Sequence, residues 1–210
     1  MNTSIKKELK KNHFRVSIFG SARIEKDNPA YKLVKQLSKM IAEEGIDLVT
    51  GGGPGLMHAA NAGHKEGKSK AHSLGLVIKL DTEKKGNPHL DIEKQFTKFS
   101  ERLDDFMMLS NVVVVAPGGI GTLLEFFYTW QLVQVKHICN IPIILLGDMW
   151  KPLLEWIEKY PLKKKLLNKE DLDNVIVVKN CPDAMKIIKE HHKAFKEGKS
   201  NLCITYRKYK

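Results

Sequence analysis

The sequence predicts an α/β protein with a doubly wound, mainly parallel β-sheet in a single domain. Apolar runs with strand character alternate with segments of helical spacing from Arg15 to Lys196. Three of the predicted strands end in turns rich in glycine or serine, at 20–21, 51–55 and 117–121. Ligands bind such sheets at the carboxyl ends of the strands, so we expect these turns to surround one site.

The first half of the chain supplies three strands and two helices in alternation. The expected strands are 15–20, 47–50 and 73–80, and the expected helices are 31–44 and 56–65. The helices stop at Gly45 and before Gly67, where glycine commonly ends a helix. Residues 81–91 are polar and contain glycine and proline, which predicts a loop.

The second half continues the alternation. Residues 92–109 carry apolar side chains every three or four positions, which predicts one long helix. The expected elements that follow are strands 112–115, 143–146 and 175–178, and helices 122–136, 150–159 and 183–196. We find no repeat and no linker, so we expect one domain over 14–197, a polar extension over 1–13 and a basic tail over 198–210.

Charge and composition restrict the class of partner. The formal net charge is +11, from 35 lysine and arginine residues against 24 acidic ones. Only Arg15, Arg23, Arg102 and Arg207 are arginine. A nucleic-acid reader normally uses more arginine, because its planar fork pairs with phosphate and guanine. We therefore do not expect nucleic acid as a partner.

Apolar runs, cysteines and histidines predict the cellular compartment and whether a metal is bound. No apolar run approaches the about 20 residues that cross a bilayer, and residues 1–11 do not resemble a secretory signal. The three cysteines are scattered, which indicates reduced thiols and a cytoplasmic protein. The eight histidines form no metal motif, so we expect no metal and no cofactor.

Residues 112–125 are the most informative stretch. Four valines form a buried strand, a turn with Pro117, Gly118, Gly119 and Gly121 follows, and Thr122 opens a helix. Bare N–H groups and the helix dipole make such a turn a phosphate site. Glu125 places a carboxylate one helical turn away, which suggests chemistry on a nucleotide.

A purely structural interpretation of this helix start also exists. Thr122 and Glu125 have the spacing of a capping box, in which both side chains satisfy backbone donors. Apolar residues surround the rest of the helix, which predicts burial nearly all round. Thr122, Glu125 and Thr129 then form a polar stripe on one face, and such a stripe needs polar partners.

The glycine turns do not match the common nucleotide fingerprints. Gly51 and Gly53 are not followed by the third glycine of the dinucleotide pattern, and no Gly-Lys-Ser/Thr follows a glycine loop. We therefore expect a mononucleotide.

The glycine motifs together resemble the LOG family, the cytokinin riboside 5′-monophosphate phosphoribohydrolases long labelled lysine decarboxylases. The resemblance covers about residues 15–160. The matching motifs are Gly20-Ser21-Ala22-Arg23, Gly51-Gly52-Gly53-Pro54-Gly55-Leu56-Met57, Arg102, and Pro117-Gly118-Gly119-x-Gly121-Thr122-x-x-Glu125.

This resemblance implies a Rossmann-like homodimer that hydrolyses the N-glycosidic bond of a nucleoside 5′-monophosphate to free base and ribose 5-phosphate. It assigns catalysis to Arg102 and Glu125. Together with the polar stripe, these motifs give the expected substrate-binding residues Gly20, Ser21, Arg23, Gly51, Gly52, Gly53, Met57, Pro117, Gly118, Gly119, Gly121, Thr122 and Thr129. Plant-like members differ at Leu103, Ile120 and Leu124, so AMP or another purine monophosphate is expected beside the cytokinin substrate.

The chemistry of this pair can also be argued from the residues. Cleavage of an N-glycosidic bond builds positive charge on the ribose, and a nearby carboxylate such as Glu125 stabilises it and orients water. Arg102 can hold that carboxylate ionised. The alternative for Arg102 is a surface ion pair with Glu101 or Asp105.

Three other functions fit the sequence less well. A non-hydrolytic carrier is the main alternative, because molybdenum-cofactor carriers share the fold and similar glycine turns. A single-stranded DNA binder related to DprA would need arginine and exposed aromatic residues. A pyridoxal-phosphate decarboxylase is rejected, because no lysine is marked for a Schiff base.

Overall fold

A computed structural model describes residues 7, 11–79 and 86–199. Seven parallel strands form one sheet in the order β4-β3-β2-β1-β5-β6-β7. They are β1 (Arg15–Phe19), β2 (Asp47–Thr50), β3 (Ser73–Ile78), β4 (Ile92–Phe96), β5 (Val112–Val115), β6 (Ile143–Leu146) and β7 (Val175–Val178). The chain winds outward from β1 to β4 and then returns to the other side of β1. The strand order therefore reverses between β1 and β5, and the predicted doubly wound single domain is confirmed.

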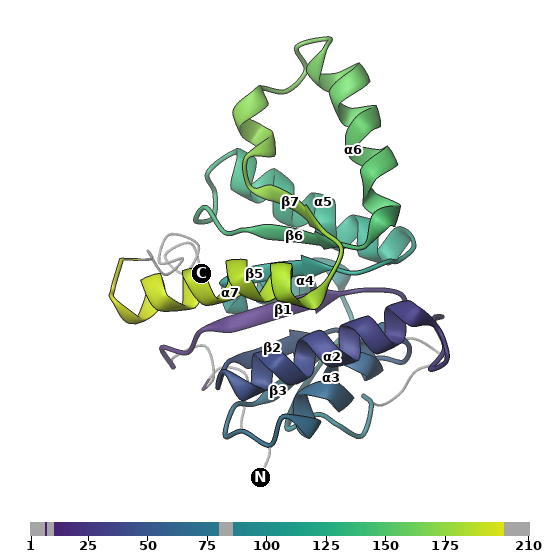
Figure 1. Cartoon of the computed structure of the whole chain (residues 1–210), viewed down its shortest axis with the longest axis vertical. Coiled ribbons are helices and arrows are strands. Elements are labelled where there is room, and N and C mark those ends of the chain that lie inside the picture. Colours follow the sequence, from purple (N-terminus) through teal and green to yellow (C-terminus); the bar gives the residue numbers. More distant parts are fainter. Residues whose placement is uncertain (1–6, 8–10, 80–85, 200–210) are drawn as a thin grey trace.

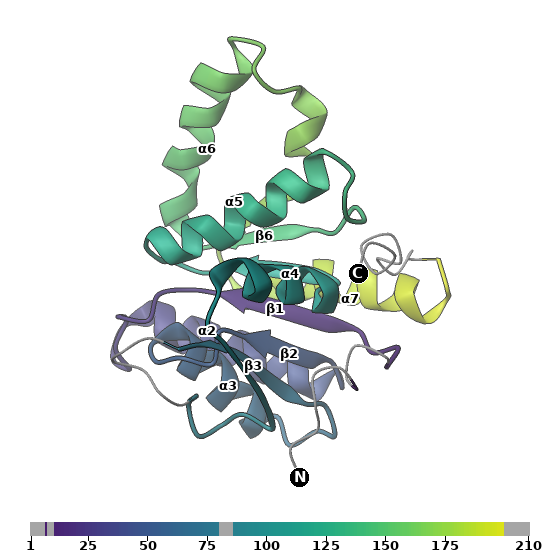
Figure 2. The same cartoon turned by 180° about the vertical axis from the view of Figure 1, so that it is seen from behind.

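Helices cover both faces of the sheet. α2 (Pro29–Glu43), α3 (Leu56–Glu66) and α7 (Cys181–Lys196) lie on one face, and Figure 1 shows them in front. α4 (Phe99–Leu109), α5 (Ile120–Gln134) and α6 (Lys151–Ile157) lie on the other, and α4 and α5 come to the front in Figure 2. Because successive strand residues point to opposite faces, Ile18 enters the first core and Phe19 the second.

α2, α5 and α7 each begin two residues earlier than expected. The Asn28 side chain accepts from the Ala30 N–H at 2.9 Å and caps α2, and Asn180 caps α7 by accepting from the Asp183 N–H. Proline follows each cap within the first turn, where its missing N–H costs nothing. An asparagine cap with proline in the first turn therefore marks the start of α2 and of α7 better than the apolar periodicity does.

The long helix expected over 92–109 is wrong in its first part. Residues Ile92–Phe96 form edge strand β4, which pairs in register with β3 from Leu74 to Ile78, and α4 begins only at Phe99. Residues four apart share a face both in a helix and in a strand, so the spacing of Ile92 and Phe96 fits either. Pairing with β3 decides the outcome.

The segment after β6 is more irregular than expected. α6 ends at Ile157 and continues as a π-helical turn, Glu158–Leu162, that contains Pro161. Short 3₁₀ helices occupy Asp148–Trp150 and Lys169–Leu172. None of the helices in the described part of the chain is both long and apolar enough to cross a bilayer.

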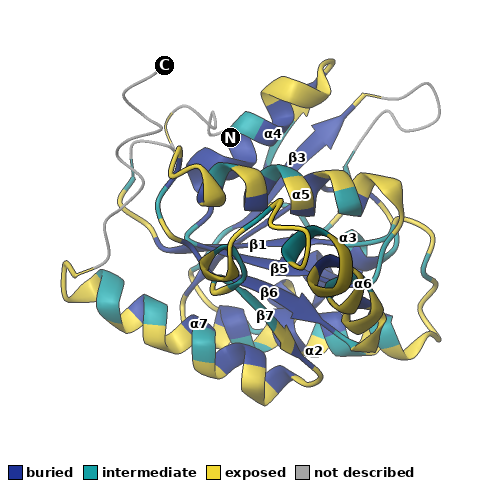
Figure 3. Ribbon diagram, turned by 90° about the horizontal axis from the view of Figure 1, so that it is seen from above, coloured by how far each residue is buried: buried dark blue, intermediate teal, exposed yellow. Residues whose placement is uncertain are grey.

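The expectation that α5 is buried nearly all round is also wrong. Its inner side is buried at Phe126 and Trp130, but Leu124, Phe127 and Val135 on the outer side are 45%, 42% and 57% exposed. Figure 3 shows buried and exposed residues alternating along this helix. The polar extension and the basic tail expected at the ends lie largely outside the described residues.

Candidate active site

The turns after β1, β2 and β5 are joined by backbone hydrogen bonds. The Ser21 N–H donates to the Pro117 carbonyl at 3.0 Å, and the Leu56 N–H donates to the Ser21 carbonyl at 2.8 Å. These turns follow the strands on both sides of the point where the strand order reverses. The structure therefore brings the three predicted glycine motifs together at the carboxyl edge of the sheet.

This contact requires glycine at position 55. Gly55 has a φ of +64°, and a Cβ there would lie 2.4 Å from the Ser21 carbonyl oxygen. A side chain would therefore separate the turn after β2 from the turn after β1. The motif residue Gly20 packs against Leu56 in the same junction.

The turn after β5 leads into α5 without a capping side chain. The N-cap is Gly119, and the helix begins at Ile120, before Thr122. Glycine has no side chain to cap with, so the capping-box interpretation of Thr122 and Glu125 is wrong. A Cβ on Gly118 would lie 2.1 Å from Thr122 Oγ1, so the turn closes tightly over the buried threonine. No side-chain acceptor within the described residues caps the α5 N-terminus.

Arg102 and Glu125 form a buried ion pair. Arg102 Nη1 donates to Glu125 Oε1 at 3.0 Å, and their side chains are only 8% and 11% exposed. Arg102 Nε donates to the Leu76 carbonyl at 2.6 Å. The surface ion pair considered for Arg102 is wrong, because the arginine is buried and pairs with the buried Glu125.

Burial dominates the electrostatics of this pair. It raises the pKa of Glu125 from 4.5 to about 7, although the charge and the hydrogen bond of Arg102 act in the opposite direction. Arg102 also makes a cation–π contact, since its guanidinium carbon lies 5.1 Å from the centroid of the Phe106 ring. Glu125 therefore exchanges a proton near neutral pH, which suits a group that acts on substrate.

The first glycine of the β2 turn lies against this ion pair. A Cβ on Gly51 would lie 2.2 Å from Arg102 Nη2 and 2.6 Å from Met57 Sδ. Gly51 thus leaves room for the guanidinium to reach Glu125, and Met57 lies beside it. Both residues were predicted at the site, and the structure brings them to the Arg102–Glu125 pair.

Asn87 was not anticipated from the sequence, yet it holds the β2 turn. Its backbone N–H donates to the Gly52 carbonyl at 2.8 Å, and its amide donates to the Gly53 carbonyl at 3.1 Å and to Asn61 Oδ1 at 2.8 Å. Thr50 Oγ1 accepts from the Gly52 N–H at 3.0 Å. The one sequence feature that could have pointed to Asn87 is its position before Pro88 in the polar segment 81–91.

The remaining predicted residues lie less centrally. Ser21 Oγ accepts from the backbone N–H of Arg23 at 3.0 Å, and Arg23 itself is exposed. Thr129 is fully buried, and its hydroxyl donates to the Glu125 backbone carbonyl at 2.7 Å. Its hydroxyl is thus used inside α5, so the polar stripe expected to reach a ligand ends at Glu125.

Comparison with known proteins points to one family. Residues 57–188 match the family described as "Possible lysine decarboxylase". A rice (Oryza sativa subsp. japonica) protein named cytokinin riboside 5′-monophosphate phosphoribohydrolase LOG is 30% identical over 129 residues, which is 59% of this chain. The matched region spans about half of that relative, 51% of its length.

Solved structures share the fold. A molybdenum cofactor binding protein from Rippkaea orientalis superposes with a TM-score of 0.65 at 21% identity, over 85% of this chain and 96% of its own. The molybdenum cofactor carrier protein from Chlamydomonas reinhardtii superposes with a TM-score of 0.66 at 22% identity. The match covers 86% of this chain and 99% of the carrier protein. At this level of identity the likeness concerns the fold alone.

Proposed function

The chain belongs to the LOG family, described as possible lysine decarboxylases, and from this we propose that it hydrolyses purine nucleoside 5′-monophosphates at the N-glycosidic bond. The products are the free base and ribose 5-phosphate. The substrates we propose are AMP and cytokinin riboside 5′-monophosphate, with no cofactor. The observation that carries the proposal is the buried Arg102–Glu125 pair, one helical turn from the uncapped start of α5.

In the proposed mechanism Glu125 acts on the ribose. Departure of the base leaves positive charge on C1′ and the ring oxygen, and the ionised carboxylate stabilises that charge and orients the attacking water. Arg102 acts on the carboxylate, because its Nη1 favours the ionised form while its Nε is held by the Leu76 carbonyl. Thr129 helps to position Glu125 by bonding its backbone carbonyl.

The phosphate is assigned to the turn from Gly118 to Thr122. The first N–H groups of a helix attract anions. The N-cap of α5 is Gly119, and no side chain of the described residues makes a cap hydrogen bond there that would compete with an anion. The neighbouring turns at 20–23 and 51–57 are proposed to contact the rest of the nucleotide. They are joined to the phosphate turn through the Ser21 hydrogen bonds.

The carrier function is the competing proposal, prompted by the names of the structural neighbours. A passive phosphate site gains nothing from a carboxylate nearby, since like charges repel. Burying Glu125 beside Arg102 also costs desolvation energy that simple anion binding does not require. The buried pair therefore favours hydrolysis.

We also propose a homodimer in the cytoplasm. The outer side of α5 exposes Ile120 (83%), Leu124 (45%), Phe127 (42%) and Val135 (57%), which recur at helical spacing. Such an apolar stripe on a helix is typical of a surface that a second copy covers. The scattered spacing of the three cysteines in the sequence supports a reducing compartment.

The test is release of base from a panel of nucleotides. Purified protein is incubated with AMP, cytokinin riboside 5′-monophosphate and adenosine, and free base is measured by chromatography. We expect release from the monophosphates and nearly none from adenosine, because phosphate binding energy is used to reach the transition state. Equal rates on AMP and adenosine contradict the phosphate assignment, and tight AMP binding without any release supports the carrier.

A further inference from the structure

Three metal-binding side chains meet at the amino edge of the sheet, opposite the candidate active site. His13 precedes β1, Asp47 begins β2 and His72 precedes β3, so the parallel strands bring them side by side. One ligand atom from each lies within 4.8 Å of the other two. We propose that His13, Asp47 and His72 bind a divalent transition-metal ion of the Zn²⁺ type.

The distances are close to those of a metal site. His13 Nδ1 lies 2.8 Å from Asp47 Oδ2, and His72 Nδ1 lies 4.0 Å from Asp47 Oδ1. Zinc bonds of about 2.0–2.2 Å in a tetrahedron place ligand atoms roughly 3.3 Å apart. The observed separations bracket this value, so small side-chain rotations suffice. Asp47 is held in place, because its Oδ1 accepts from the His72 N–H at 2.8 Å and its own N–H donates to the Phe14 carbonyl at 3.3 Å.

His72 supplies an independent sign that a ligand is expected. Its Nδ1 is shielded from solvent and has no hydrogen-bond partner within the described structure. A buried ring nitrogen without a partner costs free energy, and an ion between it and Asp47 would satisfy it. The side chains of His13 and His72 are still 43% and 39% exposed, so an ion has a path to the site.

The neighbouring charge selects the class of metal. Arg15 Nε lies 3.6 Å from Asp47 Oδ2 and already compensates much of its negative charge. A hard cation such as Mg²⁺ or Ca²⁺ depends on several oxygen ligands and on carboxylate charge, and this site offers one compensated carboxylate. Two imidazoles suit Zn²⁺ and its neighbours in the transition series.

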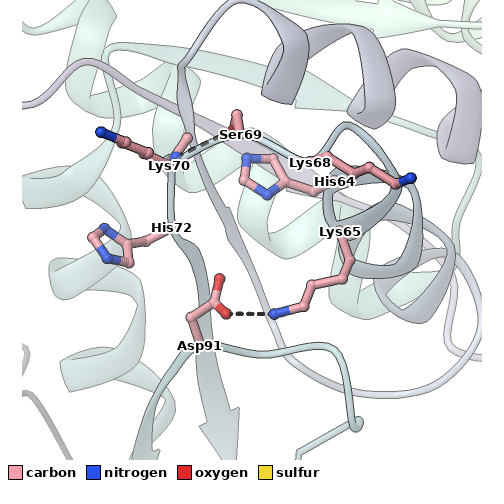
Figure 4. A pocket seen from close by; sticks show the side chains of 8 residues that line it. His64, Lys65, Lys68, Ser69, Lys70, His72 and Asp91 are labelled. Carbon is pink, nitrogen blue, oxygen red and sulfur yellow. Dashed lines mark hydrogen bonds and ion pairs between the residues drawn. The ribbon is translucent and has the colours of Figure 1, made fainter.

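The site leaves one tetrahedral position for water or an anion. His72 also lines a cavity of about 400 Å³ with Lys65, Lys68 and Lys70, which Figure 4 shows. This cavity lies at the amino edge and contains neither Arg102 nor Glu125. Metal binding is therefore expected to link the segments before β1, β2 and β3 without changing the candidate active site.

The experiment is calorimetric titration of the full-length protein with ZnCl₂, beside the variants His13→Ala and His72→Ala. We expect one ion per chain and an affinity at least about tenfold lower in each variant, since loss of an outer-shell group alone costs 10–100-fold. His191→Ala on α7 is the control and is expected to bind as the wild type. Thermal unfolding should show that Zn²⁺ raises the Tm of the wild type and of the control more than that of either variant.

Two results overturn the proposal. One is the absence of stoichiometric binding at micromolar ZnCl₂. The other is equal affinity in the wild type, His13→Ala and His72→Ala, which would place the ion elsewhere on a chain with eight histidines. Both variants change half-exposed side chains, so their folding is checked by Tm without metal.

Discussion

Arg102 Nη1 and Glu125 Oε1 lie 3.0 Å apart between helices α4 and α5, and both side chains are almost fully buried. An exposed ion pair of this length would lower the pKa of the carboxyl. Here burial outweighs the arginine, and the pKa of Glu125 rises to about 7. The same group can thus be a neutral acid or a charged base near neutral pH, and four predictions follow from its surroundings.

Glu125→Gln is expected to fold and to lose activity. Glutamine keeps an oxygen that can accept from Arg102 but lacks the charge that stabilises the ribose cation. Release of base from AMP should fall by at least about a hundredfold, while AMP still binds in a calorimetric titration. Glu101→Gln, an exposed carboxylate on α4, is the matched control and should retain wild-type rates. Full activity in Glu125→Gln would remove Glu125 from the mechanism.

The rate of base release is expected to rise with pH around neutrality. The proposed chemistry needs ionised Glu125, whose pKa is about 7, so kcat/KM should fall tenfold for each pH unit well below that value. The second ionisation of the substrate phosphate, near about pH 6, adds a separate step at lower pH. A profile of kcat, measured at saturating AMP, reports the same carboxyl in the enzyme–substrate complex. A profile that is flat from pH 5 to 8 would contradict an essential carboxylate with this pKa.

Stability should depend on pH through the same group. A carboxyl whose pKa is raised by folding contributes stability that is fully present below its ordinary value of 4.5 and is lost as pH rises through about 7. The Tm of the wild type, measured relative to Glu125→Gln, is therefore expected to decrease between about pH 4.5 and 7. The difference between wild type and Glu101→Gln should stay constant over that range. An opposite slope would show that Arg102 outweighs burial.

Gly51→Ala is expected to disable the pair without unfolding the protein. The new Cβ would lie 2.2 Å from Arg102 Nη2 and 2.6 Å from Met57 Sδ, and both are ends of flexible side chains that can move aside. The Arg102 guanidinium then leaves Glu125, so kcat should fall by about tenfold or more with a modest decrease in Tm. Crystallography of the variant would show the displaced arginine.

Gly121→Ala is the packing control for this substitution. No atom lies within 4 Å of the Cβ it would add, and alanine favours the helix, so Tm should not fall. If the phosphate occupies the start of α5, KM for AMP rises while Arg102 stays in place. Equal kinetic effects in both variants would indicate a general disturbance of the turns.

Phe127→Lys is expected to separate the proposed homodimer. Phe127 is 42% exposed on the apolar outer side of α5, and a charge there would be buried without a partner in a dimer. Light scattering at micromolar concentration should report a dimer for the wild type and a monomer for the variant. Trp156→Lys changes a residue of similar exposure, 54%, on α6 and should remain dimeric. A monomeric wild type would contradict the proposal.

Local patterns predicted most of the sheet. The strands 47–50, 112–115, 143–146 and 175–178 were located correctly because runs of β-branched and aliphatic residues end in turn-forming residues. The edge strand Ile92–Phe96 was missed, because its apolar spacing fits a helix and only pairing with β3 distinguishes the two. The opposite edge strand, Val175–Val178, consists only of β-branched residues and was recognised for that reason.

Turn residues and helix starts depend on nearby sequence, so the sequence predicted a site at the three glycine turns and Glu125, and the family resemblance added Arg102. The sequence could not decide between a capping box and a catalytic carboxylate at Glu125, or between a surface and a buried Arg102. Those choices depend on contacts between residues far apart in the sequence, such as Arg102 with Glu125, 23 positions away, and Arg102 with the Leu76 carbonyl, 26 positions away. Packing of α4 against α5 buries both side chains, which brings Arg102 to Glu125 and raises the pKa of Glu125.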